Sequence, residues 1–507
     1  MDPLLVTLED QYLNILGILA AYTVFHFLIY PLFLSPLSKI PGPKLTALSS
    51  WYLDIKYLQE RASSHVEELH RQYGPIVRVG PSEIVINDSK NLATIYGVSS
   101  AFPKPPAAAR FDNFGYPCAF SSRYKNEHRE RRRATAKVYT MSSIMGNESL
   151  LNFIRNRLDK VTRLIDDDAG SVTDLFAIAI RFALDNVTFM VLGESFLTLD
   201  GKNVETTKSL SNNLVIAAPM YRLQRMFEIL SFWPLKKLLS RDLQYALRGN
   251  HSDFDNVVKE KFDHAFANAS ELKDEKSTLG WADTTGASII YMLHTLALPE
   301  HKAYQDRLRS EICTLPYPFS FKDVCSLPFL ECCAREILRM YSPGPGSIQQ
   351  RCTPASTRTA ITVGDKVYHL PGNTQIGIQQ FSLHRNVEIY GDDVDTFSPA
   401  RWETKNEERL QAMKDAWIPF GYGSRICVGI KYVQHVDYSK YHLDFIGKLT
   451  SLSLATVELK MMTATLLHQY DVRLPNGARR EDMAPVLGAV IRPKSGKCKL
   501  LFRKLSK

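Results

Sequence analysis

Cysteine is scarce in this chain, and the spacing of the cysteines matches no regular disulfide framework. Eight cysteines are spread over 507 residues, at positions 118, 313, 325, 332, 333, 352, 427 and 498. Cys332 and Cys333 are adjacent in a predicted helix, a placement that suits a disulfide poorly. This usage argues against a disulfide-stapled secreted domain and favours a reducing compartment.

A large excess of charge, internal repeats and low-complexity tracts are also lacking. The formal net charge is only +9, and no basic stripe is interleaved with aromatic residues, which argues against nucleic-acid binding. This mild excess suits an anionic membrane or an acidic redox partner. Apolar residues make up 45% of the chain, enough for a large core. Length alone suggests about three domains, but one large enzyme fold is equally compatible.

Residues 12–34 contain no Asp, Glu, Lys or Arg. A helix of this length spans the roughly 30 Å hydrocarbon core of a bilayer. Lys39, Lys44 and Lys56 follow the run, and positive charge on this side predicts a cytoplasmic body. A cleaved signal peptide and a buried core helix are the alternatives. The acidic N-terminus and the length of the apolar run argue against the signal peptide.

Prolines then predict a stiff connection. Pro36, Pro41 and Pro43 fall within residues 36–44, and proline fixes φ and ends helices. We therefore expect an anchor at residues 1–35, a hinge at 36–44 and a catalytic domain at 45–507.

The remaining patterns predict a helix-rich chain with small sheets. Residues 73–88 read as a β-hairpin, and 366–370 and 374–378 as short strands. Apolar spacing predicts helices from about residue 147 to 269. Within them, residues 185–193 predict one buried helix ending at Gly193.

Cys427 is the most informative residue. It lies in the segment F-G-Y-G-S-R-I-C-V-G at residues 420–429, where glycines permit a tight turn. Such a turn can present a thiolate, and Arg425 adds positive charge beside it. Haem with a thiolate axial ligand fits this arrangement. The alternative is a free cysteine in a glycine-rich turn.

The pattern F-x-x-G-x-R-x-C-x-G, carried here by Phe420, Gly423, Arg425 and Cys427, resembles the haem site of the cytochrome P450 family. The resemblance extends from the hinge to the C-terminus. It implies the cytochrome P450 fold, mainly α with small β-sheets in one large catalytic domain. It also implies haem as cofactor, with Cys427 as the iron ligand.

An E-x-x-R motif precedes this segment. Glu336 and Arg339 lie one helical turn apart, which alone indicates an ordinary surface ion pair. The order of Glu336, Arg339 and Arg401 ahead of Cys427 resembles the Glu-Arg-Arg triad of the family. The resemblance therefore implies that these three side chains form a structural clamp.

Two further segments resemble family motifs. Residues 280–285, G-W-A-D-T-T, are similar to the distal acid–alcohol motif, so Asp283 and Thr284 are implied to relay protons to dioxygen. The same residues are also typical of a helix N-cap. His128 and Arg132 are similar to the pair that binds haem propionates, and Arg351 and Arg425 are further candidates.

Two segments depart from the family pattern. Residues 270–278 are polar where an apolar half-helix is usual, and Trp281 replaces a glycine. Residues 431–453 separate Cys427 from the helix expected to follow it directly. We hypothesise that both are gene-model faults, which sequencing the spliced transcript would test.

The resemblance implies a fungal, membrane-anchored monooxygenase of the endoplasmic reticulum, with its catalytic domain in the cytoplasm. It would take electrons from NADPH–cytochrome P450 reductase and act on a lipophilic small molecule of secondary metabolism. Residues 101–115, 215–232 and 344–347 are expected to line the substrate pocket. Alternatives are a haem-thiolate isomerase or dehydratase, and an inactive product.

Overall fold

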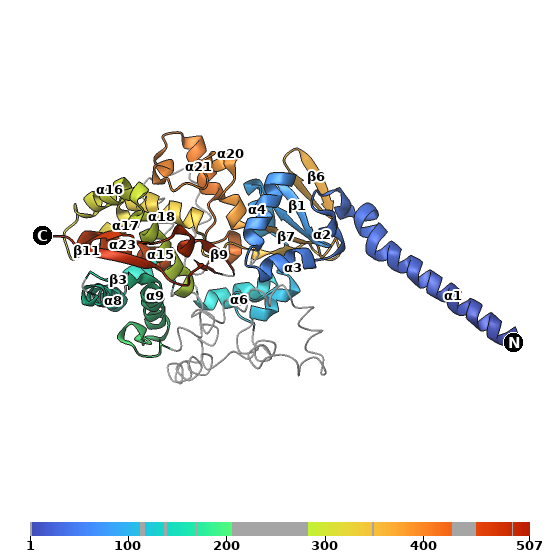
Figure 1. Cartoon of the computed structure of the whole chain (residues 1–507), viewed down its shortest axis with the longest axis horizontal. Coiled ribbons are helices and arrows are strands. Elements are labelled where there is room, and N and C mark those ends of the chain that lie inside the picture. The colour runs from blue at the N-terminus through green and yellow to red at the C-terminus, as the bar shows by residue number, and fades with distance from the viewer. Residues whose placement is uncertain are drawn as a thin grey trace.

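The computed structural model describes residues 3–111, 117–135, 139–168, 170–204, 282–346, 349–427, 453–488 and 490–506. Helices dominate these residues, and the strands form small sheets (Figure 1). The expected class, mainly α with small β-sheets, is confirmed. Predictions for residues 215–232, for Trp281 and for most of the segment 431–453 lie outside the described residues.

A long helical rod forms the N-terminal end. α1 (Pro3–Val24) continues into the π-helical segment η1 (Phe25–Leu34), and the rod projects away from the body (Figure 1). The part Leu13–Leu34 is long and apolar enough to cross a membrane, and none of its residues is buried. An apolar helix without a protein core around it is suited to the bilayer, so this part is a membrane-anchor candidate.

A second helix is similarly apolar but belongs to the core. Most of α9 (Leu175–Leu192) is buried, and it packs against α8 (Glu148–Asp167) and α15 (Ala282–Ala297). It ends at Gly193, whose φ of 72° is left-handed and favours glycine. The predicted helix at residues 185–193 is the second half of α9, which begins earlier because residues 175–184 are also apolar.

The largest sheet joins distant parts of the chain. Its strands lie in the order β1 (Ile76–Gly80), β2 (Glu83–Ile86), β7 (Gln375–Ile378) and β4 (Arg351–Cys352). β1 and β2 form the predicted antiparallel hairpin. β2 then pairs in parallel with β7, and β4 pairs antiparallel with β7. This sheet therefore places Arg351 beside β7, one strand away from the β1–β2 hairpin.

Three smaller sheets complete the strands of the described residues. They pair β5 (Thr359–Val363) with β6 (Lys366–Leu370), β9 (Pro485–Leu487) with β10 (Ile491–Pro493), and β11 (Lys499–Lys504) with both β3 (Val172–Asp174) and β8 (Tyr470–Arg473). The strands predicted at residues 366–370 and 374–378 are confirmed as β6 and β7.

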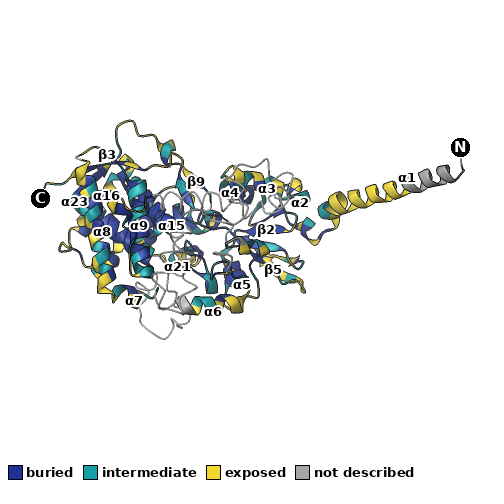
Figure 2. Ribbon diagram, turned by 90° about the horizontal axis from the view of Figure 1, so that it is seen from below, coloured by how far each residue is buried: buried dark blue, intermediate teal, exposed yellow. Residues whose placement is uncertain are grey.

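α15 runs through the centre of the helical core. It packs against α9, α18 (Pro328–Met340) and α23 (Leu454–Gln469), and Figure 2 shows α15 and α9 as mostly buried. Gly286 permits the close approach of α15 to α9, since a Cβ there would lie 2.9 Å from Cγ1 of Ile180. This helix carries Asp283 and Thr284 in its first turn.

The other described elements are short helices and 3₁₀ turns that connect these parts. They are η2 (Pro36–Lys39), α2 (Lys44–Leu48), α3 (Trp51–Leu58), α4 (Ala62–Tyr73), η3 (Ser89–Asn91), α5 (Leu92–Tyr96), η4 (Pro106–Phe111), α6 (Lys125–Thr135), α7 (Met141–Met145), η5 (Thr198–Asp200), η7 (Pro299–His301), α16 (Lys302–Ile312), α17 (Phe321–Ser326), α19 (Gln380–Leu383), α20 (Val387–Tyr390), η9 (Pro399–Glu403), α21 (Glu407–Ala416), η10 (Gly423–Arg425) and η12 (Arg480–Met483).

Candidate functional site

A buried carboxylate organises the segment that leads to Cys427. Glu336, on α18, accepts hydrogen bonds from Arg339 at 2.8 and 3.0 Å and from Arg401 at 3.2 Å. The indole N–H of Trp402 donates at 2.9 Å to Oε2 of Glu336, the oxygen that Arg401 does not contact. All four side chains are buried. The three side chains expected to form a triad therefore make its contacts, and they tie η9 to α18.

The chain then forms the turn that presents Cys427. Gly421 and Gly423 have φ of 83° and 72°, a left-handed conformation that side chains rarely adopt. A Cβ on Gly423 would also collide with the carbonyl oxygen of Tyr96 in α5. The amide of Cys427 donates to the carbonyl of Phe420 at 2.8 Å, which closes the turn. Cys427 is half-buried and forms no disulfide with another described cysteine.

Two guanidiniums connect this turn to α6 and to the residues just before that helix. Arg132, on α6, donates to the carbonyls of Ile426 at 2.6 Å and Cys427 at 3.4 Å. In the opposite direction, Arg425 donates to the carbonyls of Ser122 at 2.6 Å and Arg123 at 2.9 Å. Arg132 and Arg425 were both expected at the haem propionates. In this structure Arg132 also braces the turn to α6, and Arg425 braces it to Ser122 and Arg123, which precede α6.

His128 lies among positive charges. Its imidazole is buried on α6, and burial, reinforced by Arg425, Arg132, Lys104 and Arg351, lowers its pKa to about 3. It is therefore neutral at physiological pH. A neutral imidazole retains one N–H donor, so His128 can still bind a carboxylate by a hydrogen bond.

The cations of this cluster repel one another. Burial and then the charge of Arg351 lower the pKa of Arg425 to about 9. Burial, followed by Arg351 and Arg425, likewise holds the pKa of Lys104 well below its usual value. Arg351 is itself buried on β4, with its guanidinium 5.0 Å from the ring centre of Tyr96. An anion bound among these groups would relieve their repulsion.

Lys104 is the residue that sequence reasoning missed. Its ammonium donates to the carbonyl of Phe120 and lies 4.0 Å from the centre of that ring. It falls in the segment expected to line a substrate pocket, and no local pattern marks a lysine for burial. Its neighbours Pro103 and Pro105 indicate only a rigid, extended connection.

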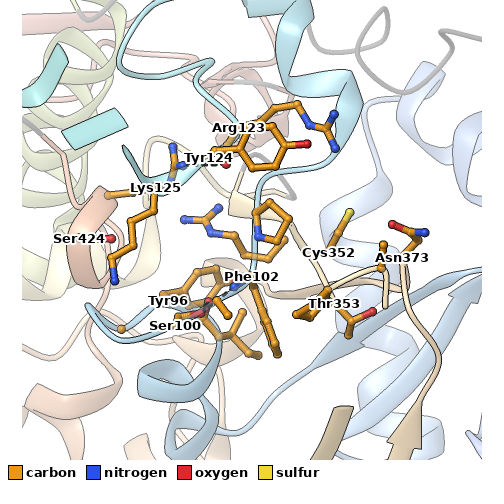
Figure 3. Close-up of a pocket in the computed structure, with 18 of the residues that line it drawn as sticks. Tyr96, Ser100, Phe102, Arg123, Tyr124, Lys125, Cys352, Thr353, Asn373 and Ser424 are labelled. Atoms are coloured by element: carbon orange, nitrogen blue, oxygen red, sulfur yellow. Dashed lines mark hydrogen bonds between the residues drawn. The ribbon is translucent and has the colours of Figure 1, made fainter. Parts of the chain in front are cut away.

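A half-open cavity of about 460 Å³ leads to this cluster from outside (Figure 3). Arg351 and Arg425 form part of its wall, and Arg123 and Lys125 also line it. Figure 3 shows Tyr96, Phe102 and Cys352 around the same space. The cavity gives solvent and ions a path to Arg351 and Arg425, which line it.

Asp283 and Thr284 occupy the first turn of α15. Asp283 is buried and Thr284 is half-buried. The carbonyl of Thr284 accepts a hydrogen bond from the hydroxyl of Ser288 at 2.9 Å. The described part of α15 begins at Ala282, so it does not separate the proton-relay interpretation from the helix-cap interpretation.

The donor set fits haem. A thiol on a constrained turn provides a soft iron ligand, and the cluster of buried cations matches the two carboxylates of a porphyrin. Among the described residues, no group of three or more His, Cys, Asp or Glu side chains could hold a bare metal ion.

Comparison with known proteins agrees with this chemistry. The sequence model of the cytochrome P450 family matches residues 41–275 and 270–431. The overlap of the two matched pieces falls at the polar segment 270–278. The match ends at residue 431, where the inserted segment begins.

Similar curated proteins come from fungi. The cytochrome P450 monooxygenase tazI of Aspergillus terreus is 25% identical over 476 residues, covering 89% of this chain and 94% of its own length. The cytochrome P450 monooxygenase hepC of Aspergillus oryzae is 26% identical, covering 88% and 90%. A pisatin demethylase of Fusarium vanettenii is 25% identical, covering 83% and 85%. Since the family model spans most of the chain, we conclude that this protein belongs to the cytochrome P450 family, as a monooxygenase.

Proposed function

We propose that Cys427 ligates haem iron and that the cations around His128 bind the propionates. The observation that carries this proposal is the pair of braces on the thiolate turn, from Arg132 on α6 and from Arg425 to Ser122 and Arg123, which lead into that helix. Arg132 and Arg425 also lie around His128. One ligand could therefore contact the Cys427 thiolate and these cations at the same time. Lys104 and Arg351 would supply further charge. Phe420 and Gly423 would shape the turn rather than contact the carboxylates.

Haem bound in this way would supply the redox chemistry that places one atom of dioxygen into a substrate. The chain would contribute the proton path. We propose that the Asp283 carboxylate and the Thr284 hydroxyl pass protons from solvent towards the bound oxygen. The burial of Asp283 supports this role, since it places an ionisable group in the protein interior, where protons would have to be delivered.

We further propose a lipophilic substrate from fungal secondary metabolism and electrons from NADPH–cytochrome P450 reductase. The fungal origin of the similar monooxygenases supports both proposals. The apolar rod supports an anchor in the endoplasmic reticulum membrane, with the body in the cytoplasm. Residues 1–35, 36–44 and 45–507 would then form anchor, hinge and catalytic domain.

The carbon monoxide difference spectrum of the reduced, full-length protein tests the central proposal. A thiolate-ligated haem gives a strongly red-shifted Soret band, which we expect from the wild type and not from Cys427→Ser. Cys332→Ser is the matched control, because Cys332 is also half-buried but lies on α18. An unchanged spectrum in Cys427→Ser would refute the assignment.

A further inference from the structure

Two buried glutamine side chains lie between β2 and α19. Gln350, which directly precedes β4, is 2% exposed, and its Nε2 donates to the carboxylate of Glu83 on β2. Gln379, the N-cap residue of α19, is 3% exposed, and its Oε1 accepts from the hydroxyl of Ser382 at 2.7 Å. Each amide is therefore held at one end by a hydrogen bond to a neighbour.

The other end of each amide has no protein partner. A carboxylate only accepts hydrogen bonds, so the nitrogen of Gln350 faces Glu83 and its Oε1 faces away. Within the described part of the chain, Oε1 of Gln350 and Nε2 of Gln379 are buried and make no hydrogen bond. Burial of a donor or an acceptor without a partner is costly, so each atom calls for a group that satisfies it.

Both glutamines line the same small cavity, whose volume is about 10 Å³. The other residues of its wall are Val85, Gln349, Gly377 and Ile378. By this measure a single water needs roughly 10–15 Å³. The space therefore suits one water and is too small for an organic group.

We propose that this cavity is a binding site for one ordered water, which accepts a hydrogen bond from Nε2 of Gln379 and donates one to Oε1 of Gln350. The two amides lack one acceptor and one donor, and a water supplies both. A cation would suit Oε1 of Gln350 but would face the N–H of Gln379, so the neutral ligand is favoured. The site lies outside the proposed haem contacts and does not depend on them.

This water would connect the segment that carries Arg351 to α19. Arg351 follows Gln350 directly, and its Nη1 donates to the carbonyls of Gln349 and Gln350 at 2.9 and 3.0 Å. α19 leads to His384, whose Nε2 accepts from the amide of Ile418 at 2.9 Å, shortly before the thiolate turn. One water would thus link the neighbourhood of a buried cation to the helix that supports the approach to that turn.

A crystal structure of the full-length protein tests the site directly. We expect electron density for one water within hydrogen-bond distance of both amide atoms. We expect no such density in Gln379→Met, whose side chain has a similar length but offers no donor. Direct contact between the two amides, or density too large for one water, would overturn the proposal. Water density that persists in Gln379→Met would exclude Gln379 as a partner.

Unfolding equilibria in solution provide an independent measurement. If one water joins the two amides, loss of either partner releases it, so the effects of Gln350→Met and Gln379→Met should overlap. We expect the double variant to be more stable than the product of the single effects by roughly tenfold in the folding equilibrium constant. Thr463→Val, which removes a buried hydroxyl on α23, is the matched control, and its effect should simply multiply with that of Gln350→Met. Simple multiplication for the two glutamines would contradict a shared water.

Discussion

The guanidinium of Arg132 lies 2.6 Å from the carbonyl oxygen of Ile426, and the two residues are 294 positions apart in the chain. In the opposite direction, Arg425 donates to the carbonyl of Ser122, which precedes α6. The thiolate turn is therefore held by side chains from a distant helix as well as by its own glycines. This pairing explains how residues 423–427 can keep one conformation around Cys427.

Loss of the Arg132 hydrogen bonds should loosen the turn around Cys427. Arg132→Met loses two charge-assisted hydrogen bonds to carbonyls, and we expect it to lower the free energy of unfolding by about 2 kcal/mol. It should also reduce the haem content of the purified protein, measured as pyridine haemochrome per chain. Arg129→Met, at an exposed position of the same helix, is the control. Equal haem content in both variants would contradict the brace.

Lys104 should lower the thermal stability of the haem-free protein but slow the release of haem once haem is bound. Burial and like charges disfavour its ammonium, so Lys104→Met should raise the melting temperature of the haem-free protein. With haem, the same variant should release the cofactor faster, measured by transfer to apomyoglobin. Lys125→Met, an exposed residue of the cavity rim, should change both quantities little. A slower release from Lys104→Met would contradict a role in holding haem.

Glu336 should be the costliest polar residue to remove. Glu336→Gln takes the carboxylate from buried Arg339, whereas Arg401 keeps Asp393 at 2.8 Å, and a broken buried pair of this kind costs roughly 3–5 kcal/mol. Denaturant unfolding followed by circular dichroism measures the effect, with exposed Glu407→Gln as the control. If Glu336→Gln does not fold, Arg401→Lys, which keeps the charge, should show a smaller loss. Wild-type stability in both variants would exclude the clamp.

Glu458 should make stability fall as the pH rises. It is buried on α23, and burial raises its pKa to about 8, with a hydrogen bond to Asn186 acting in the opposite direction. Between the unfolded pKa, near 4.5, and about 8, the unfolded chain loses this proton first. Each pH unit in that window then costs the fold about 1.4 kcal/mol at most.

Glu458→Gln resembles the protonated acid and should remove this dependence. The difference in unfolding free energy between pH 5 and pH 8 should therefore be smaller in the variant by a few kcal/mol. Glu407→Gln, at the surface, should behave as the wild type. Parallel pH profiles of wild type and Glu458→Gln would show that Glu458 is ionised in the folded protein.

The sequence predicted those parts of the fold that depend on local patterns. The hairpin at β1 and β2 follows from β-branched residues around Gly80-Pro81, and the end of α9 from Gly193. The E-x-x-R spacing alone indicated only a surface ion pair, and the contacts of Glu336 with Arg339 and Arg401 were predicted from the resemblance to the family's triad. The roles of Cys427, Asp283 and Thr284 remain predictions, since their positions alone do not establish them.

Other features depend on distant contacts and could not be predicted in this way. Arg132 appeared only as a propionate ligand, because nothing local indicates that it reaches the carbonyls of Ile426 and Cys427. Lys104 was missed because its burial is imposed by segments from elsewhere in the chain. Arg78 lies in a β-strand pattern that gives no sign of a contact with Pro31.

The parallel pairing of β2 with β7 has a consequence for synthesis of the protein. Ile84 pairs with Ile376, so the hairpin formed early by the nascent chain has no partner strand until most of the chain has left the ribosome. At about 5–20 residues per second, that interval lasts roughly 15–60 seconds. During it the exposed edge of β2 needs protection, and we expect chaperones to bind ribosome-attached chains that stop before residue 375.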